Sequence, residues 1–271
     1  MKTRLLTAAV AVPLLLVVLF VLPTWVLAWI VAVFSAIGVY ELLYRTGLVR
    51  HLRLVAYSAV AALLVPVFGH YNVGHAWQVL TVLVYVSLLF MEILFSRGKL
   101  KFSKIALCAV SALVLPYAFA AIVRIQDGEM GRHLVMLPFV LAFIPDSGAY
   151  FVGIKHGKTK LAPSISPNKS LEGAISGVMT GMIGMVAYML VLQIGFKLQI
   201  NYLFALIYGL VGSAAAIFGD LCFSAIKRQT GIKDYGVILP GHGGILDRFD
   251  SMMFVAPLAE ALLLLIPVVK V

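Results

Sequence analysis

The chain consists largely of long apolar stretches that are separated by short polar segments. Residues 5–23, 54–69, 105–123 and 173–196 contain no charged side chain. An apolar run of about 18 residues or more is long enough to cross the roughly 30 Å hydrocarbon core of a bilayer. The pattern therefore predicts an all-α fold that crosses a membrane many times, rather than a soluble domain with many fully buried helices.

Nine segments fit this description, so we expect about nine transmembrane helices. The first segment follows Lys2 and Arg4 as a signal peptide would, but its apolar part exceeds the usual length of about 7–15 residues. We therefore interpret it as the first membrane helix. The expected spans are residues 5–22, 24–44, 54–69, 76–95, 105–123, 133–152, 173–196, 201–225 and 251–268.

The charged residues predict the orientation of the chain in the membrane. Only 12% of the residues are charged, and the net charge is +10. If the N-terminus is cytoplasmic, 17 of the 21 Lys and Arg residues lie on the cytoplasmic side, which is the positive-inside pattern. We therefore expect a multi-pass protein of the cytoplasmic (inner) membrane whose basic surface faces lipid headgroups and cytosolic anions. No basic helix or aromatic-interleaved patch suggests a nucleic-acid partner.

The two halves of the chain differ in the placement of their acidic residues. Residues 1–135 are expected to be plain N-terminal transmembrane helices, in which Glu41 forms a helix-end ion pair with Arg45. Residues 136–271 are expected to combine C-terminal transmembrane helices with cytosolic catalytic loops. Between residues 140 and 251 this half holds six acids, all within or beside segments expected to face the cytoplasm, and its two longer loops cover about residues 153–172 and 226–250.

Small residues recur every four positions along the seventh expected span. Gly173, Gly177 and Gly181 would lie on one face of a helix. Small residues at this spacing allow membrane helices to approach closely, so we expect these glycines to serve helix packing.

The first group of chemically active residues surrounds the loop before this span. Asp146 ends an apolar stretch, where a carboxylate needs a cationic partner or a wet cavity, and such acids are often functional. The alternative is an acid that a lysine neutralises without any chemistry. Lys169 and Ser170 directly precede the seventh helix, whose free N–H groups would favour a phosphate.

The second group lies at the end of the eighth span and in the following loop. Asp220, Ser224 and Lys227 would share one face of a helix. Asp247 and Asp250 would share another face if the ninth helix began at these residues. Carboxylates suit Mg²⁺, and lysines and arginines neutralise phosphate charge, so this set indicates nucleotidyl transfer.

The stretch from residue 224 to residue 250 resembles the signature of phosphatidate cytidylyltransferases (CDP-diacylglycerol synthases). That signature reads Ser-x-x-Lys-Arg, a spacer, Lys-Asp, and then Pro-x-His-Gly-Gly-x-x-Asp-Arg-x-Asp. The upstream stretch from residue 146 to residue 173 is also similar to the family. All fixed positions are filled, by Ser224, Lys227, Arg228, Lys233, Asp234, Pro240, His242, Gly243, Gly244, Asp247, Arg248 and Asp250.

The resemblance implies that CTP and phosphatidate give CDP-diacylglycerol and pyrophosphate in a Mg²⁺-dependent reaction. It implies metal contacts from Asp220 and Asp247, and less firmly from Asp250 and Asp146, and it allows a second, monovalent cation. Asp220, Asp247, Lys227 and Arg248 would be catalytic. The residues expected to bind substrate are Lys169, Ser224, Arg228, Lys233, His242, Gly243 and Gly244.

Two other classes of protein remain open at this point. One is a related CTP-dependent lipid enzyme, such as a polyprenol kinase or a CDP-ether-lipid synthase. The other is a transporter whose membrane acids form an ion path, although the acids gather at one membrane face and no paired broken helices occur. The small-residue faces would allow a homodimer, but no residue demonstrates one. Glu260, inside the ninth span, has no assigned role.

Overall fold

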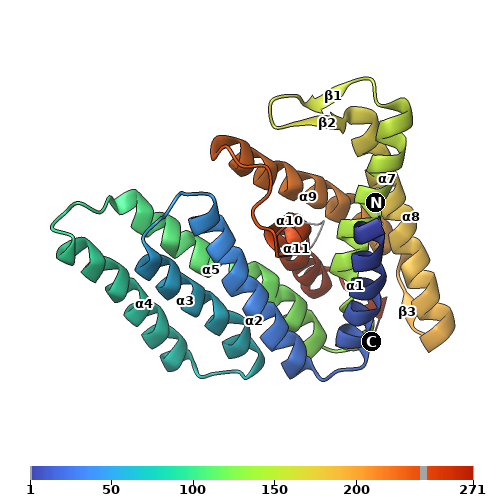
Figure 1. The fold of residues 1–271 in the computed structure, drawn as a ribbon. Coiled ribbons are helices and arrows are strands. Elements are labelled where there is room, and N and C mark those ends of the chain that lie inside the picture. Colours follow the sequence, from blue (N-terminus) through green and yellow to red (C-terminus); the bar gives the residue numbers. More distant parts are fainter. Residues whose placement is uncertain (1, 239–242, 271) are drawn as a thin grey trace. The chain divides into compact units, whose positions relative to one another are not determined.

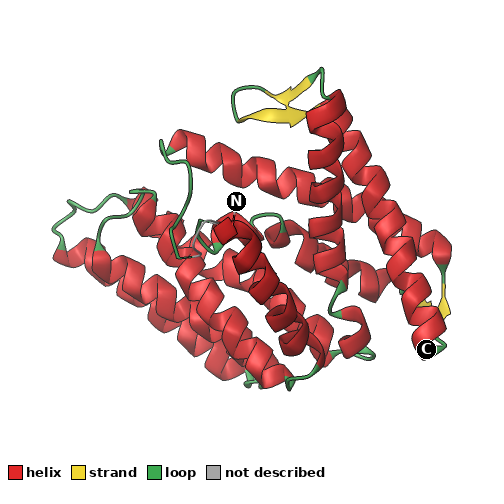
Figure 2. Ribbon diagram, turned by 45° about the vertical axis from the view of Figure 1, so that its right-hand side comes forward, coloured by secondary structure: helices red, strands yellow, loops and turns green. Residues whose placement is uncertain are grey.

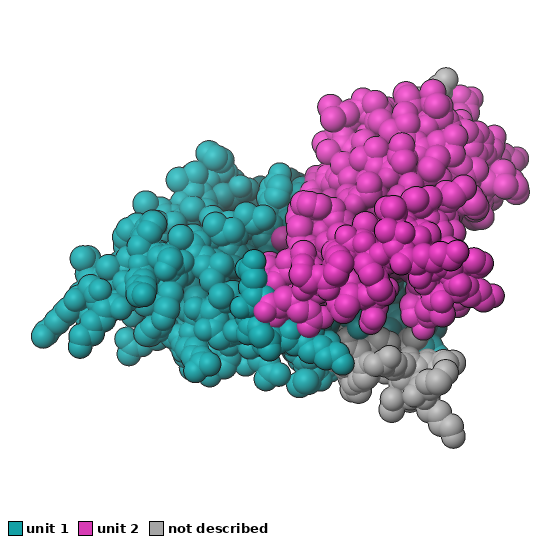
Figure 3. All heavy atoms as spheres, turned by 90° about the horizontal axis from the view of Figure 1, so that it is seen from above, with its two compact units in different colours: residues 1–129, 229–249 teal, residues 130–228, 250–271 magenta. Residues whose placement is uncertain are grey.

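The structure is a computed structural model that describes residues 2–238 and 243–270, apart from the side chains of residues 2–8 and 270. Helices form almost all of it (Figure 2). The chain folds into two compact units, each built from two stretches of sequence (Figure 3). The first contains residues 1–129 and 229–249, and the second contains residues 130–228 and 250–271.

The first unit is a helical bundle (Figure 1). Its helices are α1 (Lys2–Phe20), α2 (Thr24–Tyr40), which continues as a π-helical turn (Glu41–Arg45), α3 (Leu52–His70), α4 (His75–Phe95), α5 (Phe102–Asp127) and the short α10 (Leu246–Phe249). Small side chains line the contacts among α2, α3 and α5, where Ala32, Ala62 and Ala112 are fully buried. The helix α4 is mostly exposed and apolar, as expected for a surface that contacts lipid.

The second unit is built on long helices that carry a small hairpin. These helices are α6 (Gly131–Leu134), α7 (Leu137–His156), α8 (Leu171–Phe196), α9 (Tyr202–Gln229) and α11 (Met252–Leu265). The antiparallel strands β1 (Lys160–Ala162) and β2 (Ser166–Ser170) connect α7 to α8 and extend beyond their ends (Figure 1). A second pair, β3 (Gln199–Ile200) and β4 (Val269–Lys270), joins the start of α9 to the end of the chain.

The contact between α7 and α8 depends on glycine, as the sequence predicts. A Cβ atom at Gly177 would lie 2.9 Å from the carbonyl oxygen of Pro145, and one at Gly173 would lie 3.3 Å from the Cα of Gly153. Gly181 faces Pro145 and Ser213 at a similarly close approach. The three glycines therefore serve helix packing, which confirms the expectation for this face.

The apolar helices agree with a multi-pass membrane protein. Seven helical segments between residues 24 and 229 are long and apolar enough to cross a bilayer, and shorter apolar helices occupy residues 9–20 and 252–265. The all-α class is confirmed. The number of nine spans and the cytoplasmic N-terminus remain predictions, since length and composition alone do not orient a helix.

Two features of the chain path were not expected from the sequence. The loop over residues 153–172 contains the β1–β2 hairpin, which is stabilised where the Glu172 carboxylate accepts hydrogen bonds from the backbone N–H groups of Lys158 and Thr159 at 3.1 Å each. In addition, residues 229–249 belong to the N-terminal unit, whereas the sequence suggested a single boundary at 135/136.

Candidate active site

One group of predicted residues comes together in the second unit, around the C-terminal half of α9. Lys169, at the end of β2, forms an ion pair with the carboxylate of Asp220, and both side chains are about one quarter exposed. The hydroxyl of Ser224 donates a hydrogen bond to the other oxygen of Asp220 at 3.2 Å. Asp220 and Ser224 therefore share one face of α9, as the four-residue spacing predicts.

Two further carboxylates interact electrostatically with Asp220. Asp146 of α7 is exposed, and its charge interacts unfavourably with that of Asp220 and favourably with that of Lys169. Asp250 lies in the turn before α11 and is only 8% exposed.

The environment of Asp250 disfavours its ionised form. Burial, together with the neighbouring Asp220 carboxylate, raises the pKa of this carboxyl to about 7, although the charge of Lys227 opposes the shift. The turn itself is fixed by a 2.8 Å hydrogen bond from the backbone N–H of Ser251 to the Asp250 carboxylate. It also approaches α9 closely at Gly219, where a Cβ atom would lie 3.2 Å from the Asp250 carbonyl oxygen.

The start of α8 and the end of α9 are tied to the hairpin. Ser170 caps α8, because its hydroxyl accepts a hydrogen bond from the backbone N–H of Gly173 at 3.1 Å. The guanidinium of Arg228 donates to the carbonyl oxygen of Ile165 at 3.0 Å. The hairpin therefore carries Lys169 at its end and also holds the side chain of Arg228.

The second group of predicted residues lies in the first unit, where the signature loop folds back on itself. One carboxylate oxygen of Asp247 accepts hydrogen bonds from the backbone N–H groups of Tyr235, at 2.8 Å, and Gly244, at 2.9 Å. Gly243 has a φ of 85°, a conformation that favours glycine, and a Cβ there would lie 2.8 Å from Asp247. Asp247 thereby holds both ends of the loop together.

The other residues that were predicted to bind substrate differ in exposure and in the unit to which they belong. Lys233 and Arg248 are exposed residues of the first unit, as binding of a solvated polyphosphate requires. His242 lies outside the described residues, so its predicted contact with substrate remains a prediction. Lys227 of α9 is half-buried and interacts with Asp250.

The structure corrects the prediction that Asp247 and Asp250 share a helical face. Asp247 belongs to α10, which ends at Phe249, and α11 begins only at Met252. The break occurs because the Asp250 carboxylate binds the adjacent backbone N–H and competes with a continuous helix. The two acids therefore belong to separate elements, one in each unit.

The prediction that Glu41 forms an ion pair with Arg45 was also wrong. Its carboxylate is 1% exposed and accepts hydrogen bonds from the backbone N–H groups of Ile245, at 3.1 Å, and Leu246, at 2.9 Å, instead of forming an ion pair with Arg45. The four-residue spacing to Arg45 gave the wrong interpretation, because the local π-helical turn changes the direction of the side chain. Glu92 lies 3.9 Å from the guanidinium of Arg53 and accepts a 3.4 Å hydrogen bond from the hydroxyl of Tyr57.

The residues present suit a divalent cation by their chemistry. Asp146, Asp220 and Asp250 offer hard oxygen donors whose mutual repulsion a cation would relieve. Across residues 2–238 and 243–270, however, no three acidic, histidine or cysteine side chains are close enough to form a preassembled metal site. Lys169 supplies the positive charge at Asp220 in this arrangement.

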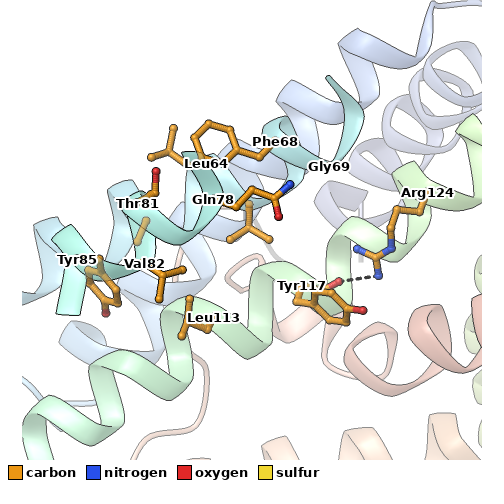
Figure 4. A pocket seen from close by; sticks show the side chains of 12 residues that line it. Leu64, Phe68, Gly69, Gln78, Thr81, Val82, Tyr85, Leu113, Tyr117 and Arg124 are labelled. Carbon is orange, nitrogen blue, oxygen red and sulfur yellow. Dashed lines mark hydrogen bonds between the residues drawn. The ribbon is translucent and has the colours of Figure 1, made fainter. Parts of the chain in front are cut away.

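A groove in the first unit contains none of these residues. It has a volume of about 290 Å³ and lies between α3, α4 and α5 (Figure 4). Its walls are mainly apolar, and at one end the guanidinium of Arg124 lies 4.4 Å from the centre of the Tyr117 ring. The groove is separate from the chemistry described above.

The fold is that of a polytopic membrane protein, with predicted site residues gathered in two groups. The sequence profile of the cytidylyltransferase family matches residues 2–266, so the chain belongs to that family. It is 33% identical to a phosphatidate cytidylyltransferase of Bacillus subtilis, over 98% of each chain. It is 32% identical to a phosphatidate cytidylyltransferase of Staphylococcus epidermidis, over 97% of this chain and 99% of the relative.

Proposed function

We propose that this enzyme transfers CMP from CTP to phosphatidate and so forms CDP-diacylglycerol and pyrophosphate. The names of the full-length relatives and the complete signature support this reaction. The structural observation that carries the proposal is the group formed by Asp146, Asp220 and Asp250 with Lys169. Such a group fits a substrate that brings both phosphate charge and a cation.

The reaction requires no nucleophile from the protein. A phosphate oxygen of the lipid attacks the α-phosphorus of CTP and forms a new phosphorus–oxygen bond. The bond that breaks joins the α-phosphorus to the oxygen that bridges it to the β-phosphorus. Pyrophosphate leaves with the electron pair of that bond. Catalysis then consists of alignment and charge stabilisation, as in other phosphoryl transfers.

The basic residues would perform most of this work. Lys169 and Lys227 lie beside the acids of the second unit, and Arg228 is held to the hairpin, so all three would orient phosphates. Lys233 and Arg248 would contact the polyphosphate from the signature loop, and the glycines 243 and 244 would let the backbone approach it.

A divalent cation fits the acids, and Asp220 and Asp247 are the proposed main contacts, with Asp250 and Asp146 as further candidates. When bound, Mg²⁺ would supply positive charge to the phosphates during transfer. The protein side chains would hold this charge, orient the lipid phosphate and limit access of water. We further propose that the acids open to the cytosol, from which CTP arrives, and that phosphatidate keeps its acyl chains in the bilayer.

The test uses the purified protein in detergent with phosphatidate, Mg²⁺ and CTP that is labelled at the α- or the γ-phosphate. We expect the α-label alone to enter the lipid, and EDTA and Asp247→Asn each to abolish this transfer. Asp127→Asn is the matched control, since Asp127 pairs with His70 outside the signature. Transfer of the γ-label would instead establish a lipid kinase, and transfer of neither label would refute the proposed reaction.

A further inference from the structure

The buried carboxylate of Glu41 is the feature of the fold that the proposed reaction leaves unexplained. Glu41 begins the π-helical turn that follows α2 and lies about 200 residues before the signature in the sequence. A buried acid is costly unless it is fully hydrogen-bonded. The groups that donate hydrogen bonds to Glu41 therefore indicate its role in the fold.

Both hydrogen-bond donors to Glu41 belong to the turn that carries two signature residues. The backbone N–H groups of Ile245 and Leu246 donate to separate oxygens of the carboxylate, at 3.1 and 2.9 Å. The next two residues in the chain are Asp247 and Arg248. Glu41 thus orients the peptide groups immediately before the side chains that are proposed to contact metal and phosphate.

Two glycines of the signature loop enclose the same carboxylate. A Cβ atom at Gly244 would lie 2.6 Å from one oxygen of Glu41, and a Cβ at Gly236 would lie 2.9 Å from its carboxyl carbon. One turn earlier on α2, Gly38 receives the side chain of Leu246, which would lie 3.2 Å from a Cβ there. The loop is therefore shaped to fit Glu41 rather than resting on it loosely.

Local helix geometry gives a reason for this placement. A π-helical turn inserts one extra residue into a helix and redirects the side chains that follow, and such turns occur often at functional sites. Here the turn covers Glu41–Arg45 at the end of α2. The side chain of Glu41 points to the signature loop rather than along the helix to Arg45.

We propose that Glu41 is a positioning residue of the cytidylyltransferase reaction, which fixes the turn of Asp247 and Arg248 through the backbone of residues 245 and 246. The inference rests on the proposed function, and Glu41 lies outside the signature. Glu41 does not contact substrate in this proposal. It acts through the orientation of the two signature side chains, so its loss should reduce turnover more than affinity for CTP.

The first experiment compares Glu41→Gln with wild type and with Glu92→Gln, a matched control whose acid is paired with Arg53 and Tyr57. Glutamine keeps the size of the side chain, but its NH₂ group would face a backbone N–H donor and would displace the turn. We expect kcat to fall about tenfold to hundredfold, the scale of a misplacement near 1 Å, while the KM for CTP changes much less. Glu92→Gln should retain wild-type kinetics.

A second variant tests the same contact without removing the charge. Gly236→Ala inserts a methyl group against the Glu41 carboxylate, whereas Gly69→Ala, the control, has no heavy atom within 4 Å of the new methyl. We expect Gly236→Ala to reproduce the kinetic defect of Glu41→Gln and Gly69→Ala to be silent. This pair decides the question if Glu41→Gln fails to fold.

A readout that needs no activity separates this inference from the proposed reaction. Lys233 is exposed at the start of the loop, so the rate of trypsin cleavage after it reports how firmly the loop is held. We expect faster cleavage in Glu41→Gln and Gly236→Ala at a temperature at which both variants remain folded. The inference would be overturned if both variants showed wild-type rates of cleavage and turnover. It would also be overturned if the loss of activity in each variant were fully explained by the fraction of protein that is unfolded. If the wild type makes no CDP-lipid, the proposed reaction fails, and the cleavage rates alone decide the role of Glu41.

Discussion

At the scale of single residues, the main electrostatic feature of the second unit is a group of three acids that interact with two lysines, Lys169 and Lys227. Asp220 is paired with Lys169, and the charges of Asp146 and Asp250 act on the same region. Removal of one partner from a half-buried ion pair leaves the other charge uncompensated, which costs more than the pair itself contributes. Lys169 therefore stabilises the fold in addition to any contact with phosphate.

This imbalance predicts the behaviour of a double variant. Lys169→Met should lower the free energy of unfolding by about 1–2 kcal/mol in EDTA, less than for a fully buried pair because both side chains are about one quarter exposed. Addition of Asp220→Asn should recover most of that loss, because it removes the uncompensated charge. Thermal unfolding in detergent measures both effects.

The control for this prediction lies on the same hairpin. Lys160 is an exposed residue of β1, so Lys160→Met should leave stability nearly unchanged. If the double variant is no more stable than Lys169→Met alone, the ion pair does not neutralise the acids of this region, and another cation must do so.

At the scale of elements, the packing of α7 on α8 depends on the absence of side chains. Gly177→Ala would bring a methyl group to 2.9 Å from the Pro145 carbonyl oxygen, and Gly181→Ala would bring one to 2.8 Å from the Pro145 ring. Overpacking of this kind usually costs about 1–3 kcal/mol. We expect both variants to unfold at lower temperature than wild type.

Another glycine of α8 provides the matched control. Gly195 has no heavy atom within 4 Å of an added Cβ, so Gly195→Ala should be neutral or should stabilise the helix by up to about 1 kcal/mol. Equal effects at residues 177, 181 and 195 would show that helix propensity, and not close packing, governs this face.

Periodicity and charge predicted the helices and most of the residues around Asp220. Long apolar runs define membrane helices, and a spacing of four residues placed Asp220 beside Ser224 on α9. The same spacing failed for Glu41 and Arg45, because a π-helical turn does not follow the α-helical period. It failed again for Asp247 and Asp250, because a local side-chain hydrogen bond interrupts the helix between α10 and α11.

Contacts between distant parts of the chain could not be predicted in this way. Glu41 and Ile245 are 204 residues apart, and neither has a local pattern that identifies its partner. The sequence identified Lys169 and Asp220 as two separate candidate residues, but it did not predict that they form an ion pair. Tertiary packing brings these partners together, and no local spacing in the sequence predicts which residues will meet.

At the scale of the whole molecule, the distribution of basic residues predicts how the chain lies in the membrane. With a cytoplasmic N-terminus, the excess of Lys and Arg on one side predicts a cytoplasmic β1–β2 hairpin and an external loop between α3 and α4. This orientation would give CTP direct access to Lys169.

Single cysteines can test this orientation in a background without Cys108 and Cys222. Ser164→Cys, on the exposed turn of the hairpin, should react with a membrane-impermeant thiol reagent only in inverted vesicles. His75→Cys, at the exposed start of α4, should react in intact cells. The opposite pattern would reverse the orientation and would separate the acids from cytosolic CTP.

The return of residues 229–249 to the N-terminal unit has a consequence for how the protein is made. A ribosome adds about 5–20 residues per second. The backbone N–H of Ile245, which donates to the Glu41 carboxylate, lies 204 residues later in the chain. Glu41 is therefore synthesised roughly 10–40 seconds before this hydrogen-bond donor. During that interval the nascent first unit carries an unsatisfied acid at the end of a membrane helix. The first unit can therefore reach its final packing only after residues 245 and 246 have been synthesised.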